Sequence, residues 1–234
     1  MNLNSYYLYA FANQNSKPYD GDSTIKVLKE ILESGKIKSR RLRGDTDTTK
    51  GGFNGIDYIS LCDFRRRNNK PYENDPYLKG YNSYECFIKE SPSFILKKNK
   101  IAAIKPILVE PVIFDFSSRY RMCKLGNATY GRFSDLPDEV QVKNEISLDR
   151  CVGLTIPIEY MIKDHKEEWF CDKKNEGKYI THPYSLEELI AYVKELKKLL
   201  ETYNVGSKVY DLESQIELDS EDTTQKVYTI TKRK

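Results

Sequence analysis

The stretch from residue 137 to residue 157 decides the expected fold: it reads Pro-Asp-Glu-Val-Gln-Val-Lys-Asn-Glu-Ile-Ser-Leu-Asp-Arg-Cys-Val-Gly-Leu-Thr-Ile-Pro. Its first part alternates valine with polar residues, which predicts a strand with two different faces. Val140 and Val142 fall on the face expected to be buried. Glu139 and Gln141 fall on the face expected to be open.

The rest of this stretch predicts a second strand beside the first. Residues 143–145, Lys-Asn-Glu, have the composition of a turn. Residues 151–156 form an apolar, β-branched run typical of a buried strand. Glu139 would therefore begin a strand that lies next to a buried one. A carboxylate in that place is held rigidly and is well positioned for chemistry.

Outward from this stretch, the chain predicts further strands and two helices. An aromatic-rich strand is expected at residues 6–11, and another strand at 58–62 after a glycine-rich loop at 51–55. Short strands are also expected at 94–96 and 104–109.

The two expected helices have apolar stripes at helical spacing. The first is capped by Asp22-Ser23 and ended by Gly35, and the second is capped by Ser185 and ended by Gly206. The apolar stripe of the second helix is expected to pack on the core, with a partner helix as the alternative. A segment around 160–162 favours a further helix.

These elements predict an α+β fold with a core at 1–160, a C-terminal helical extension at 161–212 and a tail at 213–234. Residues 226–230 of the tail would add an edge strand or stay disordered.

Composition sets limits on the function. The chain has 234 residues and a formal net charge of +3, which is too small to indicate nucleic-acid binding without local clusters. Five widely spaced cysteines favour reduced thiols in the cytoplasm. His165 and Cys171 lack a supporting ligand set, so no metal site is expected. No apolar run approaches membrane-spanning length, and no membrane partner is expected.

The pattern Asp-Glu-Val-x-Val, a turn, and then Ile-x-Leu-x-x-x-Val-x-Leu-x-Ile-Pro resembles the last motif of the ADP-ribosyltransferase fold. It is most similar to the DarT-type enzymes, which modify nucleic acid. The helix end Ile-Leu-Glu-Ser-Gly-Lys-Ile, residues 31–37, resembles the same enzymes. Two positions depart from the pattern. Pro137 stands where many members have Gln or Glu, and the first strand reads Tyr-Ala-Phe-Ala at 9–12 where DarT-like members have His-x-Thr.

The resemblance covers residues 5–160 and implies a β-rich core of two antiparallel sheets with flanking helices and a C-terminal helix. It also implies NAD as cofactor and mono-ADP-ribosyl transfer, in a toxin or defence-type enzyme. Glu139 falls on the catalytic Glu and would stabilise the positive charge that develops on the ribose, with Glu145 as the second choice.

The resemblance further implies residues that bind NAD. One of Arg40, Arg41 and Arg43 would hold the pyrophosphate, with a solvated basic edge as the alternative. The matching strand supplies Tyr58, Ser60 and Phe64, of which Tyr58 or Phe64 would stack on the nicotinamide ring.

The acceptor is expected to be nucleic acid, DNA or RNA, rather than protein. Arg65, Arg66 and Arg67 are followed by a tyrosine-rich segment, as on surfaces that bind single strands; a solvated loop is the alternative. The loop before Glu139 adds a further set of candidate substrate contacts: Arg119, Arg121 and Arg132.

Two other functions stay open from the sequence. The first is a non-catalytic module of the same fold that binds nucleic acid or protein. The second is a structural or inhibitory partner protein that acts through the helix at 185–203. A response to NAD separates the enzyme from both.

Overall fold

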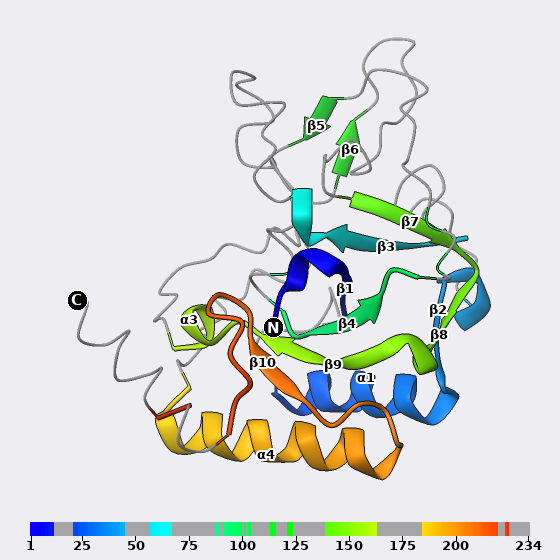
Figure 1. The fold of residues 1–234 in the computed structure, drawn as a ribbon. Coiled ribbons are helices and arrows are strands. Elements are labelled where there is room, and N and C mark those ends of the chain that lie inside the picture. The colour runs from blue at the N-terminus through cyan, green and yellow to red at the C-terminus, as the bar shows by residue number, and fades with distance from the viewer. Residues whose placement is uncertain are drawn as a thin grey trace.

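We analysed a computed structural model of the chain (Figure 1). The structure describes residues 1–11, 21–44, 57–66, 88, 91–99, 101, 103, 113–115, 121–123, 139–162, 184–219 and 223–224.

The centre of the molecule is a six-stranded sheet with the order β10-β9-β4-β1-β3-β7. Its strands are β1 (Tyr6–Ala10), β3 (Tyr58–Asp63), β4 (Ser93–Lys97), β7 (Glu139–Lys143), β9 (Cys151–Ile156) and β10 (Val209–Asp211). All neighbours are antiparallel except β9 and β10, which are parallel. The fold is therefore mixed α/β with a mostly antiparallel sheet.

Smaller elements surround this sheet. Two two-stranded antiparallel sheets are formed by β2 (Lys36–Lys38) with β8 (Glu145–Ser147), and by β5 (Ile113–Asp115) with β6 (Arg121–Cys123). The short helical turns are η1 (Leu3–Ser5), η2 (Arg41–Arg43), η3 (Phe64–Arg66), η5 (Leu148–Arg150) and α3 (Ile158–Met161).

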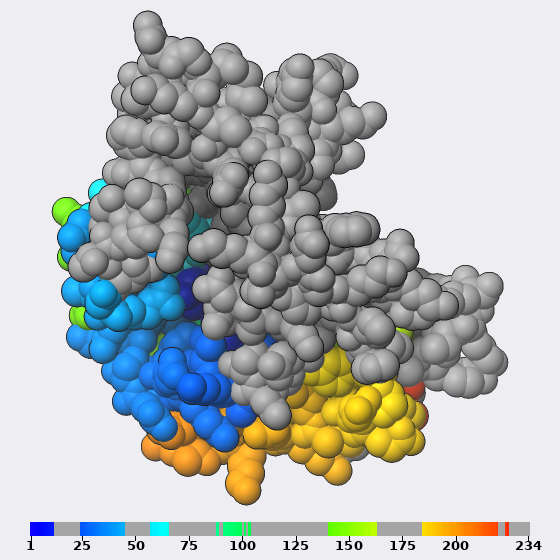
Figure 2. Space-filling model, turned by 180° about the vertical axis from the view of Figure 1, so that it is seen from behind, coloured from blue at the N-terminus to red at the C-terminus, as the bar shows by residue number. Residues whose placement is uncertain are grey.

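Two longer helices, α1 (Gly21–Ser34) and α4 (Leu186–Thr202), lie side by side under one face of the sheet (Figure 1). Ser185 and Glu188 form a capping box at the start of α4, so the predicted cap is confirmed. The outward faces of α1 and α4 form the lower part of the surface in Figure 2. None of the described helices is long and apolar enough to cross a membrane.

Apolar side chains are buried on both faces of the sheet. The larger cluster joins α1 and α4 to the sheet through Leu28, Leu196 and Phe94, among others. The apolar stripe of α4 thus belongs to the core, as predicted. The smaller cluster includes Leu8, Cys62 and Phe64.

The strand at 139–143 agrees with the prediction on one face only. Val140 and Val142 are buried, as expected. Gln141 is also buried, at 5% exposure, so the prediction of an open second face was wrong at this position. Asn144 follows in a left-handed conformation with φ of 67° and turns the chain into β8, which confirms the predicted turn.

Three other predicted elements differ from the structure or lie outside the described residues. Helix α1 begins at Gly21, so Asp22 and Ser23 lie in its first turn rather than before it. The predicted strand at 226–230 lies outside the described residues, as do all of 104–109.

Strand β10 was not expected from the sequence. It lies against β9 because the backbone before it crosses β9 closely at two glycines. A Cβ on Gly153 would lie 2.2 Å from the carbonyl oxygen of Lys208, and one on Gly206 would lie 2.7 Å from the backbone of Val152. Only residues without a side chain allow this approach.

Candidate functional site

Strands β3 and β7 bring the predicted catalytic segment beside the predicted NAD-binding strand. The Cα partners across this pair are Cys62 with Glu139, Ser60 with Gln141, and Tyr58 with Lys143. Because alternate residues share a face, these six register positions lie on one face of the sheet. Tyr58 and Ser60 are half-buried.

Strand β1 lies on the other side of β3. Leu8 is the Cα partner of Cys62, so positions 8, 62 and 139 form one row across three neighbouring strands. The sequence separates these positions widely, but the sheet makes them neighbours.

The end of β1 is aromatic and packed. Phe11 is 3% exposed, and its ring centroid lies 4.9 Å from that of Phe94. Tyr9 stacks on the same ring at 6.5 Å. These rings belong to the larger cluster or pack against it, so the end of β1, where the sequence resemblance would place a histidine, is a packed part of the core.

A guanidinium in η2 acts electrostatically on the end of β1. Burial raises the pKa of the Tyr9 phenol, and the nearby charge of Arg43 acts in the opposite direction. Arg43 is exposed. An exposed cation therefore lies within electrostatic reach of β1, although β1 itself contains none.

Arg41 is engaged differently from Arg43. Its Nε donates to Oδ1 of Asp57, and its Nη2 donates to Oδ2 at 3.3 Å. Arg41 holds the pKa of Asp57 below its ordinary value, mainly through this hydrogen bond. Arg40 precedes η2 and is half-buried.

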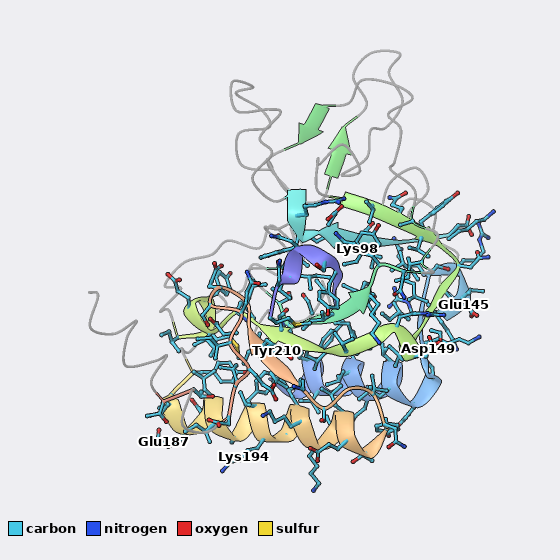
Figure 3. All side chains as sticks on the ribbon, in the orientation of Figure 1. Lys98, Glu145, Asp149, Glu187, Lys194 and Tyr210 are labelled. Atoms are coloured by element: carbon cyan, nitrogen blue, oxygen red, sulfur yellow. The ribbon has the colours of Figure 1, made fainter. Side chains whose placement is uncertain are left out.

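A buried carboxylate, Asp63, lies at the other end of β3 and is bound by Lys98, which is labelled in Figure 3. The Asp63 side chain is 2% exposed and accepts from Lys98 Nζ at 2.6 Å and from Arg65 Nη2 at 3.0 Å. Lys98 Nζ also donates to the Asn4 carbonyl at 2.8 Å and lies 5.0 Å from the centre of the Tyr7 ring.

The two cations determine the ionisation of Asp63. Burial acts to raise its pKa, but the hydrogen bonds and charges of Lys98 and Arg65 outweigh burial and hold the pKa below its ordinary value.

The remaining predicted residues fall in different places. Phe64 is 1% exposed within the smaller cluster, so its ring is a core side chain. Arg66 ends η3, and Arg121 begins β6. Arg67, Arg119 and Arg132 lie outside the described residues. Glu145 lies in β8, just past the end of β7, and binds Lys36 Nζ at 2.5 Å.

Sequence reasoning missed two polar residues of this region. Gln141 is buried and lies opposite Ser60. A polar residue in an alternating strand usually indicates an open face, so the sequence did not indicate that this face of β7 is covered at Gln141. Asp63 was overlooked because Lys98 is 35 residues away along the chain, and no local pattern links the two.

Among the described residues, no three His, Cys, Asp or Glu side chains gather as a metal site requires. Comparison of the chain with known protein families, with curated proteins and with solved structures found no match.

Proposed function

We propose that this chain is an NAD-dependent mono-ADP-ribosyltransferase that modifies nucleic acid. The observation that supports it most is the adjacency of β1, β3 and β7, the three strands singled out by the sequence resemblance. Position 139 lies directly opposite position 62, and Ser60 and Tyr58 follow on the same face. The proposal takes its chemistry from the resemblance and its support from this adjacency.

The residues near β1 fit the groups that NAD would present. A pyrophosphate needs a cation with N–H donors, and the exposed Arg43, whose charge acts on Tyr9, provides one. A positively charged ring favours an aromatic face, and the half-buried Tyr58 provides one next to Ser60. The buried Phe64 is less suited to that role than Tyr58.

NAD, when bound, supplies the ADP-ribosyl group, with nicotinamide as the leaving group. The Glu139 carboxylate stabilises the positive charge that develops as the glycosidic bond breaks, and this stabilisation acts mainly in the transition state. Arg43 holds the phosphates, and Tyr58 orients the ring. Arg41, already bound to Asp57, orients η2 rather than the ligand.

Binding and chemistry are tested separately. NAD must raise the unfolding temperature of the protein, because a ligand of the native state stabilises that state. Incubation with NAD must release nicotinamide, and DNA, RNA and protein acceptors are then compared for attached ADP-ribose. Absence of both the thermal shift and nicotinamide release would refute the enzyme proposal.

One observation favours the alternative, a non-catalytic binding module of the same fold. The end of β1 is built from packed aromatic rings, Tyr9 and Phe11, rather than from a residue that grips a ligand. This alternative predicts nucleic-acid binding without nicotinamide release.

A further inference from the structure

Three segments distant in the sequence meet at one corner of the molecule. Ser39 N donates to the Asn144 carbonyl at 2.7 Å, and Asn144 N donates to the Asp57 carbonyl at 2.8 Å. Strand β2 pairs with β8 beside this point, with Lys38 opposite Glu145. Figure 1 shows η2, β2, β8 and the ends of β3 and β7 converging there.

This corner is strongly basic. Its described residues carry six cations against two carboxylates, Asp57 and Glu145; the cations are Lys36, Lys38, Arg40, Arg41, Arg43 and Lys143. This excess is greater than the net charge of +3 of the whole chain. We call these eight residues the basic corner.

The local structure keeps the lysines of the corner at the surface. Ile37 and Ile146 pair across β2 and β8 and are buried, so Lys36 and Lys38 lie on the opposite face of β2. Lys143 is exposed at the turn, close enough to Asp57 to lower the pKa of its carboxyl, after the larger effect of Arg41.

The ion pairs within the corner leave it able to bind a polyanion. The Lys36–Glu145 pair is exposed, and pairs of this kind contribute little, so a phosphate can replace the carboxylate. In Arg41, Asp57 engages Nε and Nη2 and fixes the guanidinium, which has five N–H donors in all.

We propose that the basic corner is the surface on which the nucleic-acid acceptor docks through its phosphate backbone. The cations extend along β2 and around the turn at 144 instead of converging on one point, which suits a polymer better than a small anion. An anionic membrane fits less well, because the described residues of η2, β2 and β8, which carry most of this corner, expose one large apolar side chain, Leu42. The inference rests on the proposed function in that the bound polymer is the acceptor.

The test compares two triple-alanine variants that remove the same charge. The corner variant replaces Lys36, Lys38 and Lys143, none of which is proposed to contact NAD. The control replaces Lys194, Lys197 and Lys198 on α4. The probes are a single-stranded DNA oligonucleotide and an RNA of the same sequence, titrated over a salt series without NAD.

The corner variant should lower the slope of log affinity against log salt by about two units, at about 0.7 for each lost phosphate contact. The control should change affinity by no more than about twofold, as surface substitutions do. A third variant with arginine at the three corner positions should retain the slope. That variant separates loss of charge from loss of structure.

Equal slope changes in both alanine variants, or no binding by the unaltered protein, would overturn the proposal. Binding to phosphatidylserine vesicles but to neither oligonucleotide would also overturn it. The NAD thermal shifts of the unaltered protein and of the corner variant are measured in parallel. An unchanged salt slope in the corner variant, with NAD shifts in both proteins, contradicts this inference alone. A lowered slope in the corner variant, with no NAD shift in either protein, contradicts the enzyme proposal alone.

Discussion

Glu139 is the residue on which the proposed chemistry depends. Glu139→Gln removes the charge and keeps the shape, so we expect nicotinamide release to fall by a factor on the order of 10² to 10³, as when a group that stabilises transition-state charge is lost. The NAD thermal shift should persist. Glu145→Gln is the matched control, since Glu145 lies in β8 and forms an ion pair with Lys36 of β2. Unchanged nicotinamide release by a folded Glu139→Gln protein would show that Glu139 is not the catalytic residue.

The three arginines around η2 differ in their surroundings, so their substitutions should differ in effect. Arg43→Ala should weaken NAD binding by an amount on the order of 2 kcal/mol, because a charge-assisted phosphate contact is lost. Arg40→Ala and Arg41→Ala should have small effects on NAD, since Arg41 is held by Asp57. Calorimetric titration of the three variants with NAD makes the comparison. Equal effects would show that the pyrophosphate is held elsewhere.

Asp63 gives the fold a dependence on acidity. Because its folded pKa lies below the unfolded value of about 3.9, the ionised carboxylate contributes stability above that pH. The contribution is lost as the pH falls through the folded pKa. Asp63→Asn should lower the free energy of unfolding at neutral pH by an amount on the order of 3 kcal/mol, since Lys98 loses its buried partner.

Urea unfolding at a series of pH values checks this expectation. Below about pH 4 the unaltered protein should lose stability more steeply than Asp63→Asn, so the two curves should converge. Asp57→Asn is the control, because its partner Arg41 is exposed and the pair is open to water. Parallel curves for the unaltered protein and Asp63→Asn would assign the acid sensitivity to other groups.

At the scale of elements, the contact between β9 and the backbone before β10 has no room for a side chain. Gly153→Ala would bring Cβ to 2.2 Å from the Lys208 carbonyl oxygen, which accepts from Leu154 N at 2.9 Å. We expect β10 to separate from β9 and the unfolding temperature to fall. Gly35→Ala is the control, because φ is also positive there but nothing lies within 4 Å. Thermal unfolding of both variants should show a greater loss for Gly153→Ala.

The elements that sequence reasoning found were those with a local signature. The helix after Ser185 has a cap and a long apolar stripe, and β7 and β9 have alternation or a β-branched run. Strand β10 has only three residues, and its parallel pairing depends on Gly153 and Gly206, whose role appears only when the backbones meet. Short strands fixed by tertiary contacts leave little trace in a local pattern.

At the scale of the whole molecule, the sequence predicted several strands better than it predicted their surroundings. The resemblance put Glu139, Tyr58 and Ser60 in one site, and in the sheet their strands, β7 and β3, are paired. It did not predict that Phe64 is a core residue or that Arg65 is held by Asp63, because both depend on contacts with distant parts of the chain.

Charge also has a whole-molecule arrangement along β3. The basic corner lies at the start of β3, and Arg65 lies just beyond its other end, about 20 Å away for six residues. Replacing Arg65, Arg66 and Arg67 by alanine should lower the salt slope for single-stranded nucleic acid by about two further units. Combined with the corner variant, the losses should add, since distant sites act independently. A salt series on the combined variant measures this, and an unchanged slope would remove 65–67 from the docking surface.

The order of strands also has a consequence for synthesis on the ribosome. Strand β1 is made first among the sheet strands but lies in its interior, between β3 and β4, while β10 comes from residues that follow α4. A nascent chain therefore exposes the hydrogen-bonding edges of β1 until both neighbours have emerged. In the order of synthesis each new strand belongs outside those already made, starting from β1, and β10 can cover the β9 edge only after residue 211 has left the exit tunnel. A ribosome that stalled within α4 would hold the β3–β7 pair already available and the opposite edge of the sheet still open.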